Sequence, residues 1–212
     1  MRIELRPIQK RDYQEAIRFA IKGMNFDRYL SSRLLLNLYG RYFWYMELGR
    51  SSQVIAAYYG EKFVGVLLAD MWGEAKYAHS FWRSIYVKCF DLLQKTFCPD
   101  GVGPYDAANA EMYREFSDKY RADGEICFLA ADPDAKIKGV GTLLLDELER
   151  RESGKRIFLY TDSNCTYQFY EHRGFVRIVE KDVSLEFANV GDVPLSCYLY
   201  SKVCGNGGDT NV

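Results

Sequence analysis

The residues best suited to chemistry gather around one glycine-containing loop. The loop reads KIKGVGT over Lys136–Thr142, and from Val140 onward apolar residues recur at helical spacing. A helix entered in this way offers unpaired backbone N–H groups and the positive end of its dipole to an anion, most naturally a phosphate. Glycines 139 and 141 let that anion approach the backbone, where a Cβ would obstruct it.

A strand is predicted immediately before the loop. The run Ile126–Ala131 is apolar and lies between Gly124 and the Asp132-Pro133 pair, which are strand-boundary residues. The stretch therefore predicts a strand, a phosphate-binding loop and a helix in sequence.

Two common nucleotide-binding loops do not fit this stretch. A P-loop requires G-x-x-x-x-G-K-[ST], and the sequence contains no such run. A Rossmann fingerprint requires G-x-G-x-x-G/A, but Leu144 occupies the third small-residue position after Gly139 and Gly141. A phosphate at this loop would therefore belong to a ligand of another class than those bound by P-loops and Rossmann folds.

A second block points to that class. The segment 164–175 reads NCTYQFYEHRGF and follows a strand-like run at Arg156–Thr161. The two blocks resemble the GNAT N-acetyltransferases, whose loop is [Q/R]-x-x-G-x-[G/A] and whose second block joins an Asn to [FY]-Y-E-x-x-G-F. The resemblance spans about 124–187. Lys136 departs from it, because Gln or Arg is usual there, and it keeps the charge without the planar fork of Arg.

The resemblance implies an α/β fold of three layers, with a central mixed, mostly antiparallel sheet and one splayed parallel strand pair. It implies a single domain over 1–204, with a helical insertion at about 72–121 between the third and fourth strands. Residues 205–212 are too polar to bury much surface, so we expect a flexible tail.

The resemblance also implies acetyl-CoA as cosubstrate, without a metal, in a cleft between Ile126–Ala131 and Ile157–Thr161. Its pyrophosphate would lie on the N–H groups of the glycine loop, and the pantetheine amides on strand backbone. Asn164 is either a helix N-cap or a contact to the CoA arm. The cofactor-binding positions that the resemblance implies are Leu129, Ala130, Ala131, Lys136, Lys138, Gly139, Val140, Gly141, Thr142, Asn164 and Tyr167.

Two residues are candidates for catalysis. Tyr170 occupies the family's position for a phenol that protonates the departing thiolate, or else it packs a helix onto the sheet. Glu125, at the head of the predicted strand, lies fourteen positions before Gly139, the offset at which family members that acetylate histone lysines carry a catalytic Glu. It is a candidate base or amine-binding anion, because an alkyl amine with a pKa of ~10 must lose a proton before attack. The alternative is an exposed acid at a strand start.

The insertion predicts two helices. In the first, Trp82, Ile85, Tyr86, Cys89, Phe90, Leu93 and Phe97 fall at helical intervals, and 107–120 reads as the second. The insertion is open to three interpretations: a substrate lid, a dimer surface, or extra covering for the core. The acceptor should contact the first two helices, whose aromatic residues Phe26, Tyr29, Tyr42 and Tyr45 suit either a binding pocket or core packing.

Composition bounds the function further. The 212 residues carry a net charge of −1, which gives no reason to expect nucleic acid or an anionic membrane as partner. The six cysteines form no C-x-x-C pair, and no apolar run of ~18 residues or signal peptide is evident, so we expect a cytoplasmic protein. The resemblance implies an acetyl-CoA-dependent N-acetyltransferase that acts on a primary amine of a small molecule or peptide, and it is compatible with a homodimer. The alternative is a non-catalytic acyl-CoA sensor of the same fold.

Overall fold

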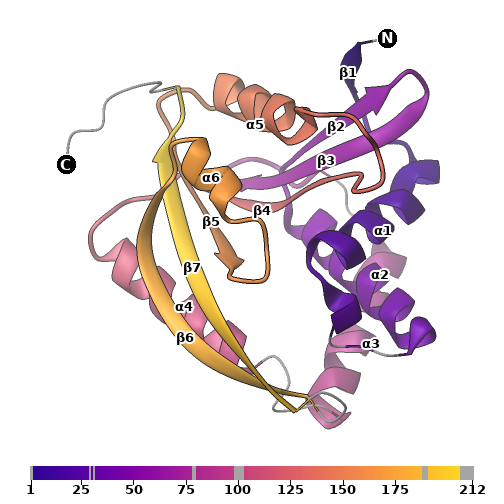
Figure 1. Cartoon of the computed structure of the whole chain (residues 1–212), viewed down its shortest axis with the longest axis vertical. Helices are drawn as coiled ribbons and strands as arrows, with labels where there is room; N and C mark the ends of the chain where they lie inside the picture. The colour runs from indigo at the N-terminus through magenta and orange to yellow at the C-terminus, as the bar shows by residue number, and fades with distance from the viewer. Residues whose placement is uncertain are drawn as a thin grey trace.

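A single mixed sheet organises the molecule in this computed structural model, which describes residues 2–28, 30, 32–77, 80–97, 103–187 and 191–205 (Figure 1). Within these residues the strand order is β1-β2-β3-β4-β5-β7-β6. The strands are β1 (Ile3–Arg6), β2 (Gln53–Tyr59), β3 (Lys62–Met71), β4 (Gly124–Ala131), β5 (Arg156–Asp162), β6 (Val176–Phe187) and β7 (Gly191–Val203). Neighbouring strands are antiparallel, except that β4 and β5 are parallel. This arrangement confirms the predicted fold class.

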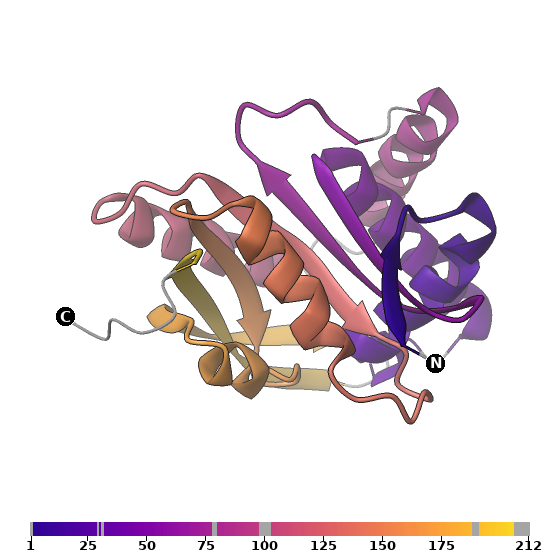
Figure 2. The same cartoon turned by 90° about the horizontal axis from the view of Figure 1, so that it is seen from above.

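Helices cover both faces of the sheet (Figure 2). One face carries α1 (Tyr13–Gly23), α2 (Arg33–Arg50) and α4 (Gly103–Ser117), and the other carries α5 (Val140–Arg151) and the short α6 (Gln168–His172). The remaining α-helix of the described residues, α3 (Phe81–Phe97), packs on α2, and two short 3₁₀ helices are η1 (Lys10–Asp12) and η2 (Phe26–Arg28). The result is the predicted three-layer arrangement.

Strand β5 shows how the core is divided. Ile157 and Leu159 are buried in the cluster beneath α5, whereas Phe158 is buried against Met112 and Phe116 of α4. Successive side chains of a strand point to opposite faces, so a central strand covered on both sides is apolar throughout. This explains the uninterrupted run that predicted the strand.

The helical insertion lies between β3 and β4, as predicted. Its second helix begins at Gly103, four residues before the predicted start, and ends at Ser117. Met112 and Phe116 are fully buried, so α4 acts as covering for the C-terminal half of the sheet. Residues 98–102 lie outside the described residues, and so does the predicted flexible tail of 205–212 except for Gly205.

Candidate active site

The two parallel strands separate soon after they meet. Both are fully described, and they pair at Gly124–Ile157 and Glu125–Phe158 but not beyond. From Ile126 to Ala131, β4 keeps its partner β3 on one side, while β5 follows β7 away to Asp162 (Figure 1). The predicted splay is confirmed, and it leaves the β5-facing edge of β4 to find other hydrogen-bond partners.

The glycine loop leads from the open end of β4 into α5. Gly139 is the N-cap of this helix and has a φ of 82°, a left-handed conformation that side chains disfavour. Val140 is buried, and a Cβ added at Gly65 of β3 would lie 2.5 Å from its Cγ1. Glycine at 65 therefore lets the first turn of α5 approach the sheet closely.

The other predicted cofactor-binding positions surround this helix start. Lys136 and Lys138 are exposed, and Thr142 is partly exposed in the first turn of α5. A Cβ at Gly141 would lie 3.4 Å from the Phe169 ring of α6. On β4, Leu129 is partly buried, Ala130 is buried and Ala131 is exposed. Loop, strand and α6 thus meet at the open end of the splay.

Asn164 does not begin a helix, so the N-cap interpretation is wrong. Helix α6 begins at Gln168 with Tyr167 as its N-cap residue. The Asn164 backbone N–H instead donates to Asp162 Oδ1 at 2.8 Å, in a turn that ends β5. Its carbonyl oxygen accepts a bond from Asn25 at 2.8 Å, and its Oδ1 one from Arg28 at 3.2 Å. Asn164 therefore connects the end of β5 to the segment after α1.

Tyr167 and Tyr170 lie on the α5 side of the sheet. The ring of Tyr167 packs against Tyr198, with centroids 5.1 Å apart. The ring of Tyr170 packs edge-on against Phe169 and Phe175. Within the described residues the Tyr170 phenol has no hydrogen-bond partner. Burial raises its pKa, and Cys165 adds to the effect, so the phenol stays protonated at neutral pH.

Glu125 takes part in a charge cluster that sequence patterns did not predict. Arg50, at the end of α2, donates from Nη2 and Nη1 to the two carboxylate oxygens of Glu125, at 2.7 and 2.8 Å. Arg50 Nε also donates to Glu47 Oε2 at 2.6 Å. Burial raises the pKa of Glu47 to about 7, against the opposing effect of Arg50. Glu125 is thus a fixed, mostly buried carboxylate, and not an exposed acid at a strand start.

The cluster lies beside an irregularity in β4. Opposite the fully described β3, Leu68 pairs with Phe128 and Ala69 with Ile126, so Cys127 is an extra residue in a β-bulge. Bulges bend a strand and redirect side chains, and they are common near active sites. The charges of Arg50, Glu47 and Glu125 all act on the Cys127 thiol, whose pKa is raised mainly by burial. The bulge therefore coincides with the start of the splay and with the charge cluster.

Tyr160 of β5 is within electrostatic reach of the same cluster. Burial raises its pKa, and the negative charge of Glu125 raises it further, so the phenol stays protonated at neutral pH. The charge of the Glu47–Arg50–Glu125 cluster sums to −1 when all three groups are ionised, which suits a cationic amine.

The sequence held one indirect signal for these residues. Glu47 and Arg50 lie on either side of Leu48 near the end of the predicted helix, so two charged residues are close to an apolar position, which the structure buries fully. Such charges are rarely buried without a partner. The partner itself, Glu125, lies 75 positions further along the chain and was not identifiable as one.

The aromatic residues predicted near the acceptor have structural roles. Phe26 is buried against Tyr39 and Phe43. Tyr42 is buried and donates to Asp91 Oδ1 of α3 at 2.6 Å. Tyr45 contacts Tyr86 edge-on. These rings join α2 to η2 and α3. Tyr29 lies outside the described residues.

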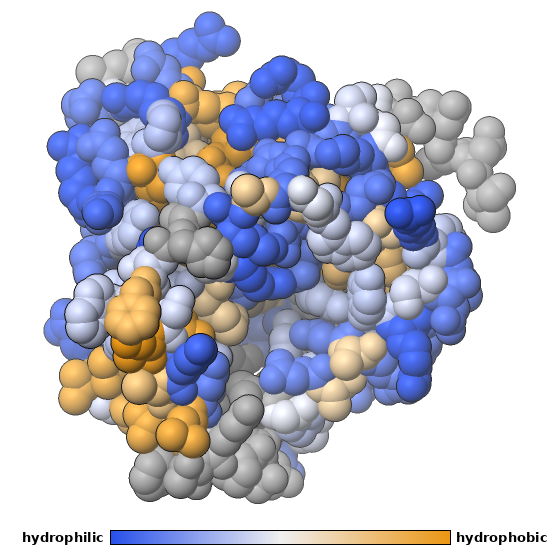
Figure 3. All heavy atoms as spheres, turned by 180° about the vertical axis from the view of Figure 1, so that it is seen from behind, coloured by the Kyte–Doolittle hydropathy of each residue, from blue (hydrophilic) through white to orange (hydrophobic). Residues whose placement is uncertain are grey.

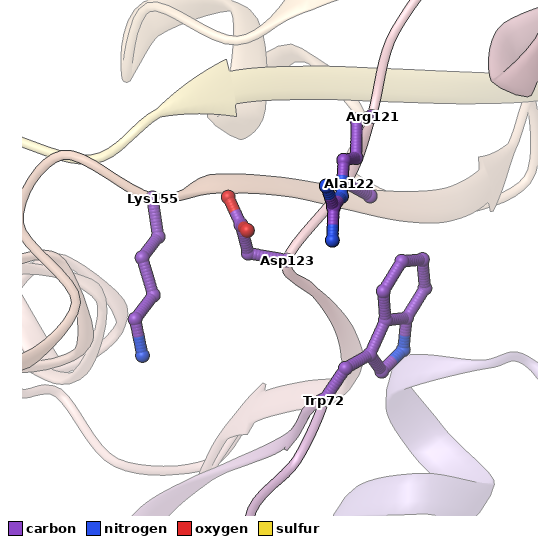
Figure 4. Close-up of a pocket in the computed structure, with 5 residues that line it drawn as sticks. All are labelled: Trp72, Arg121, Ala122, Asp123 and Lys155. Atoms are coloured by element: carbon purple, nitrogen blue, oxygen red, sulfur yellow. The ribbon is translucent and has the colours of Figure 1, made fainter.

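A small cavity of about 140 Å³ lies at the other end of β4, lined by Trp72, Arg121, Ala122, Asp123 and Lys155 (Figure 4). Two of its polar groups have structural partners: Asp123 Oδ2 accepts a bond from the backbone of Arg156, and Lys155 pairs with Glu152. Because Asp123 and Lys155 precede β4 and β5, this cavity is remote from the glycine loop that follows β4.

The described ranges contain no group of three or more His, Cys, Asp or Glu side chains placed to hold a metal ion. They contain no helix with the length and apolar character needed to cross a membrane.

Solved structures of acetyltransferases share this architecture. A histone acetyltransferase HPA2 and related acetyltransferase from Corynebacterium glutamicum is 17% identical, with a TM-score of 0.56 and 100% of both chains covered. A protein assigned to the GNAT family from Desulfovibrio desulfuricans is 13% identical, with a TM-score of 0.52, covering 96% of this chain and 100% of that one. An N-acetyltransferase from Staphylococcus aureus is 12% identical, with a TM-score of 0.52, covering 94% and 100%.

No family model matches the sequence, and neither does any curated protein. At these identities the likeness establishes the fold: the chain has the fold of the GNAT acetyltransferases.

Proposed function

We propose that this protein is an N-acetyltransferase that moves the acetyl group of acetyl-CoA to a primary amine of a small molecule or peptide, by direct attack in a ternary complex. The observation that carries the proposal is the divergence of β4 and β5 directly beside a glycine-entered helix start. Unpaired strand backbone suits a ligand with amide groups, and the helix start suits one with phosphates. Both needs are met by the same ligand, coenzyme A.

The cofactor side of the proposal uses backbone groups more than side chains. The N–H groups from Lys138 to Thr142 would hold the pyrophosphate, with the exposed Lys136 and Lys138 adding positive charge. Leu129 and Ala131 would offer backbone groups to the pantetheine arm. Asn164 and Tyr167 lie in the segment joining β5 to α6, next to the same opening.

Tyr170 is the proposed general acid. Attack of the amine nitrogen on the thioester carbonyl breaks the carbon–sulfur bond and leaves a thiolate. The Tyr170 hydroxyl, protonated at neutral pH and without a partner in the described residues, would donate its proton to that sulfur.

Glu125 is proposed to bind the acceptor amine. Arg50 holds its carboxylate with two hydrogen bonds, which fix its direction. An ionised carboxylate attracts the ammonium form of the acceptor to the splay. The ammonium proton leaves through this cluster or water before attack.

The decisive experiment is a screen of primary amines with acetyl-CoA, following release of free thiol and mass gain of the amine. We expect turnover with at least one amine, and loss of CoA binding in Gly139→Glu. Binding of CoA without turnover on any amine, together with no effect of Tyr170→Phe, would show an acyl-CoA sensor instead. Unchanged CoA affinity in Gly139→Glu would refute the cofactor site itself.

A further inference from the structure

Helix α3 has an apolar face that points to solvent. Phe81, Trp82, Leu92 and Leu93 are 73, 76, 67 and 53% exposed, and Ile85 is 37% exposed. Cys89 is also exposed. At 3.6 residues per turn these six positions fall within roughly one third of the helix circumference. The described side chains of α3 therefore form a continuous stripe without charge, which we call the α3 stripe.

The opposite face of α3 is already occupied by α2. Tyr86 donates to the carbonyl oxygen of Leu38 at 3.0 Å, and Asp91 accepts the bond from Tyr42. The Phe90 ring stacks on Tyr42, with centroids 4.6 Å apart. These contacts fix the rotation of α3, and they turn the α3 stripe away from α2. The apolar residues that periodicity grouped on one helix are thus divided between two faces.

The apolar surface continues onto the start of α2. Leu34 and Leu35 are 69 and 52% exposed. Helices α2 and α3 pack in opposite directions, since Tyr45 contacts Tyr86 and Tyr42 contacts Phe90, so the start of α2 lies toward the end of α3. Figure 3 shows apolar atoms gathered over this part of the molecule. Side chains of this number and size expose an area on the order of the ~800 Å² that each partner gives to a standard interface. This exceeds the largest apolar patch of a typical monomer.

We propose that the α3 stripe, with Leu34 and Leu35, is the interface of a homodimer in which two α3 helices pack across a two-fold axis. A two-fold interface uses the same surface on both subunits, so the surface must be complementary to itself. A stripe without charge meets that condition. Arg83 and Asp91 lie off the stripe and partly buried, and Lys88 is at its margin.

Charge favours a second copy over the other occupants of such a surface. A helix that binds an anionic membrane flanks its apolar face with exposed basic residues. Of the described side chains of α3, Lys88 is the one basic group at the margin of the stripe, and Arg83 is partly buried away from it. A charged peptide would require opposite charges within the stripe, and the stripe has none. The dimer does not depend on the proposed acetyl transfer, since the α3 stripe includes no residue assigned to the site.

The test is the molar mass of the purified full chain, by light scattering after size exclusion and by sedimentation over a wide concentration range. Trp82→Arg and, separately, Leu92→Glu place a charge in the stripe. Val176→Glu is the matched control, because Val176 of β6 is also apolar and 61% exposed but lies outside the stripe. Circular dichroism and Tm identify any variant that fails to fold. If one stripe variant is unfolded, the molar mass of the other one tests the interface.

We expect a wild-type dimer, a dissociation constant raised more than about thirtyfold by either stripe variant, and no change in Val176→Glu. Labelling of Cys89 by maleimide, located by mass spectrometry, should slow as the wild-type protein is concentrated. A wild-type chain that stays monomeric, including one that binds lipid vesicles instead, overturns the proposal. So does a dimer that both folded stripe variants leave intact.

Discussion

Arg50 and Glu125 lie 75 positions apart in the chain, yet two guanidinium nitrogens of Arg50 reach both carboxylate oxygens of Glu125. The third nitrogen of the same group reaches Glu47. One arginine thereby joins the end of α2 to β4, at the point where β4 and β5 begin to separate. The position of Glu125 is set by α2, even though Glu125 belongs to β4.

Replacing Arg50 by Lys should show the value of this planar contact. Lys keeps the charge but cannot bind two oxygens at once. We expect unfolding free energy to fall by roughly 1–3 kcal/mol, because a mostly buried carboxylate loses partners, and KM for the amine to rise. Denaturant titration and steady-state kinetics measure both. Arg41→Lys on the same helix is the control, and equal behaviour of the two variants would contradict the assigned role.

Glu47 should make stability depend on pH. Its pKa is about 7 in the folded chain, above its ordinary value of 4.5, because burial disfavours the charged form. The folded state therefore holds an extra proton between these values, and this contribution to stability is lost as pH rises through about 7. Glu47→Gln lacks that contribution.

The measurement is the difference in unfolding free energy between Glu47→Gln and wild type at a series of pH values. As pH rises from about 4.5 to about 7, the unfolding free energy of wild type should fall relative to that of Glu47→Gln, and above about 7 the difference should stay constant. A difference that is constant with pH would show that Glu47 titrates normally.

Tyr170→Phe should separate chemistry from binding. Loss of a general acid lowers kcat by typically ~10²–10⁴-fold, while the affinity for coenzyme A should change little, since the ring remains. Stopped assays of thiol release and calorimetric titration with coenzyme A provide the two numbers. Tyr120→Phe, an exposed tyrosine stacked on Phe116 of α4, is the control and should match wild type.

Gly139→Ala should harm both stability and cofactor binding. Its φ of 82° is unfavourable for any side chain, and the strain costs roughly 1–2 kcal/mol. The added methyl also points into open space, where the phosphate would approach. Gly49→Ala in α2 is a sharp control: a Cβ there meets nothing within 4 Å, so this change should be neutral or stabilising. Comparable Tm values for the two variants would argue against the strained helix start.

Local patterns predicted the elements whose residues are close in sequence. The glycine loop and the first turn of α5 lie within seven residues, so spacing alone located the helix start. The apolar runs of β4 and β5 predicted central strands because both faces of each are covered. Asn164 shows the limit of such patterns: the turn after β5 uses Asp162 as its acceptor, and the helix begins four residues later.

Features that depend on distant partners were not predictable. Periodicity identified α3 as amphipathic, but it could not say that Tyr86 and Phe90 would meet α2 while Trp82 and Leu93 would not. The bulge at Cys127 depends on the register with β3, which no local pattern reveals. The Arg50–Glu125 pair likewise depends on how α2 is placed over the sheet.

The short contact between β4 and β5 also affects how the molecule loses structure. Two residue pairs join β4 to β5, so the sheet is weakest at the boundary between these two strands. Cooperative units of a protein open separately where few contacts connect them. Amide exchange should therefore report two units: β1–β4 with α1 and α2, and β5–β7 with α4. A ligand that contacts both β4 and β5 should make the two units exchange as one.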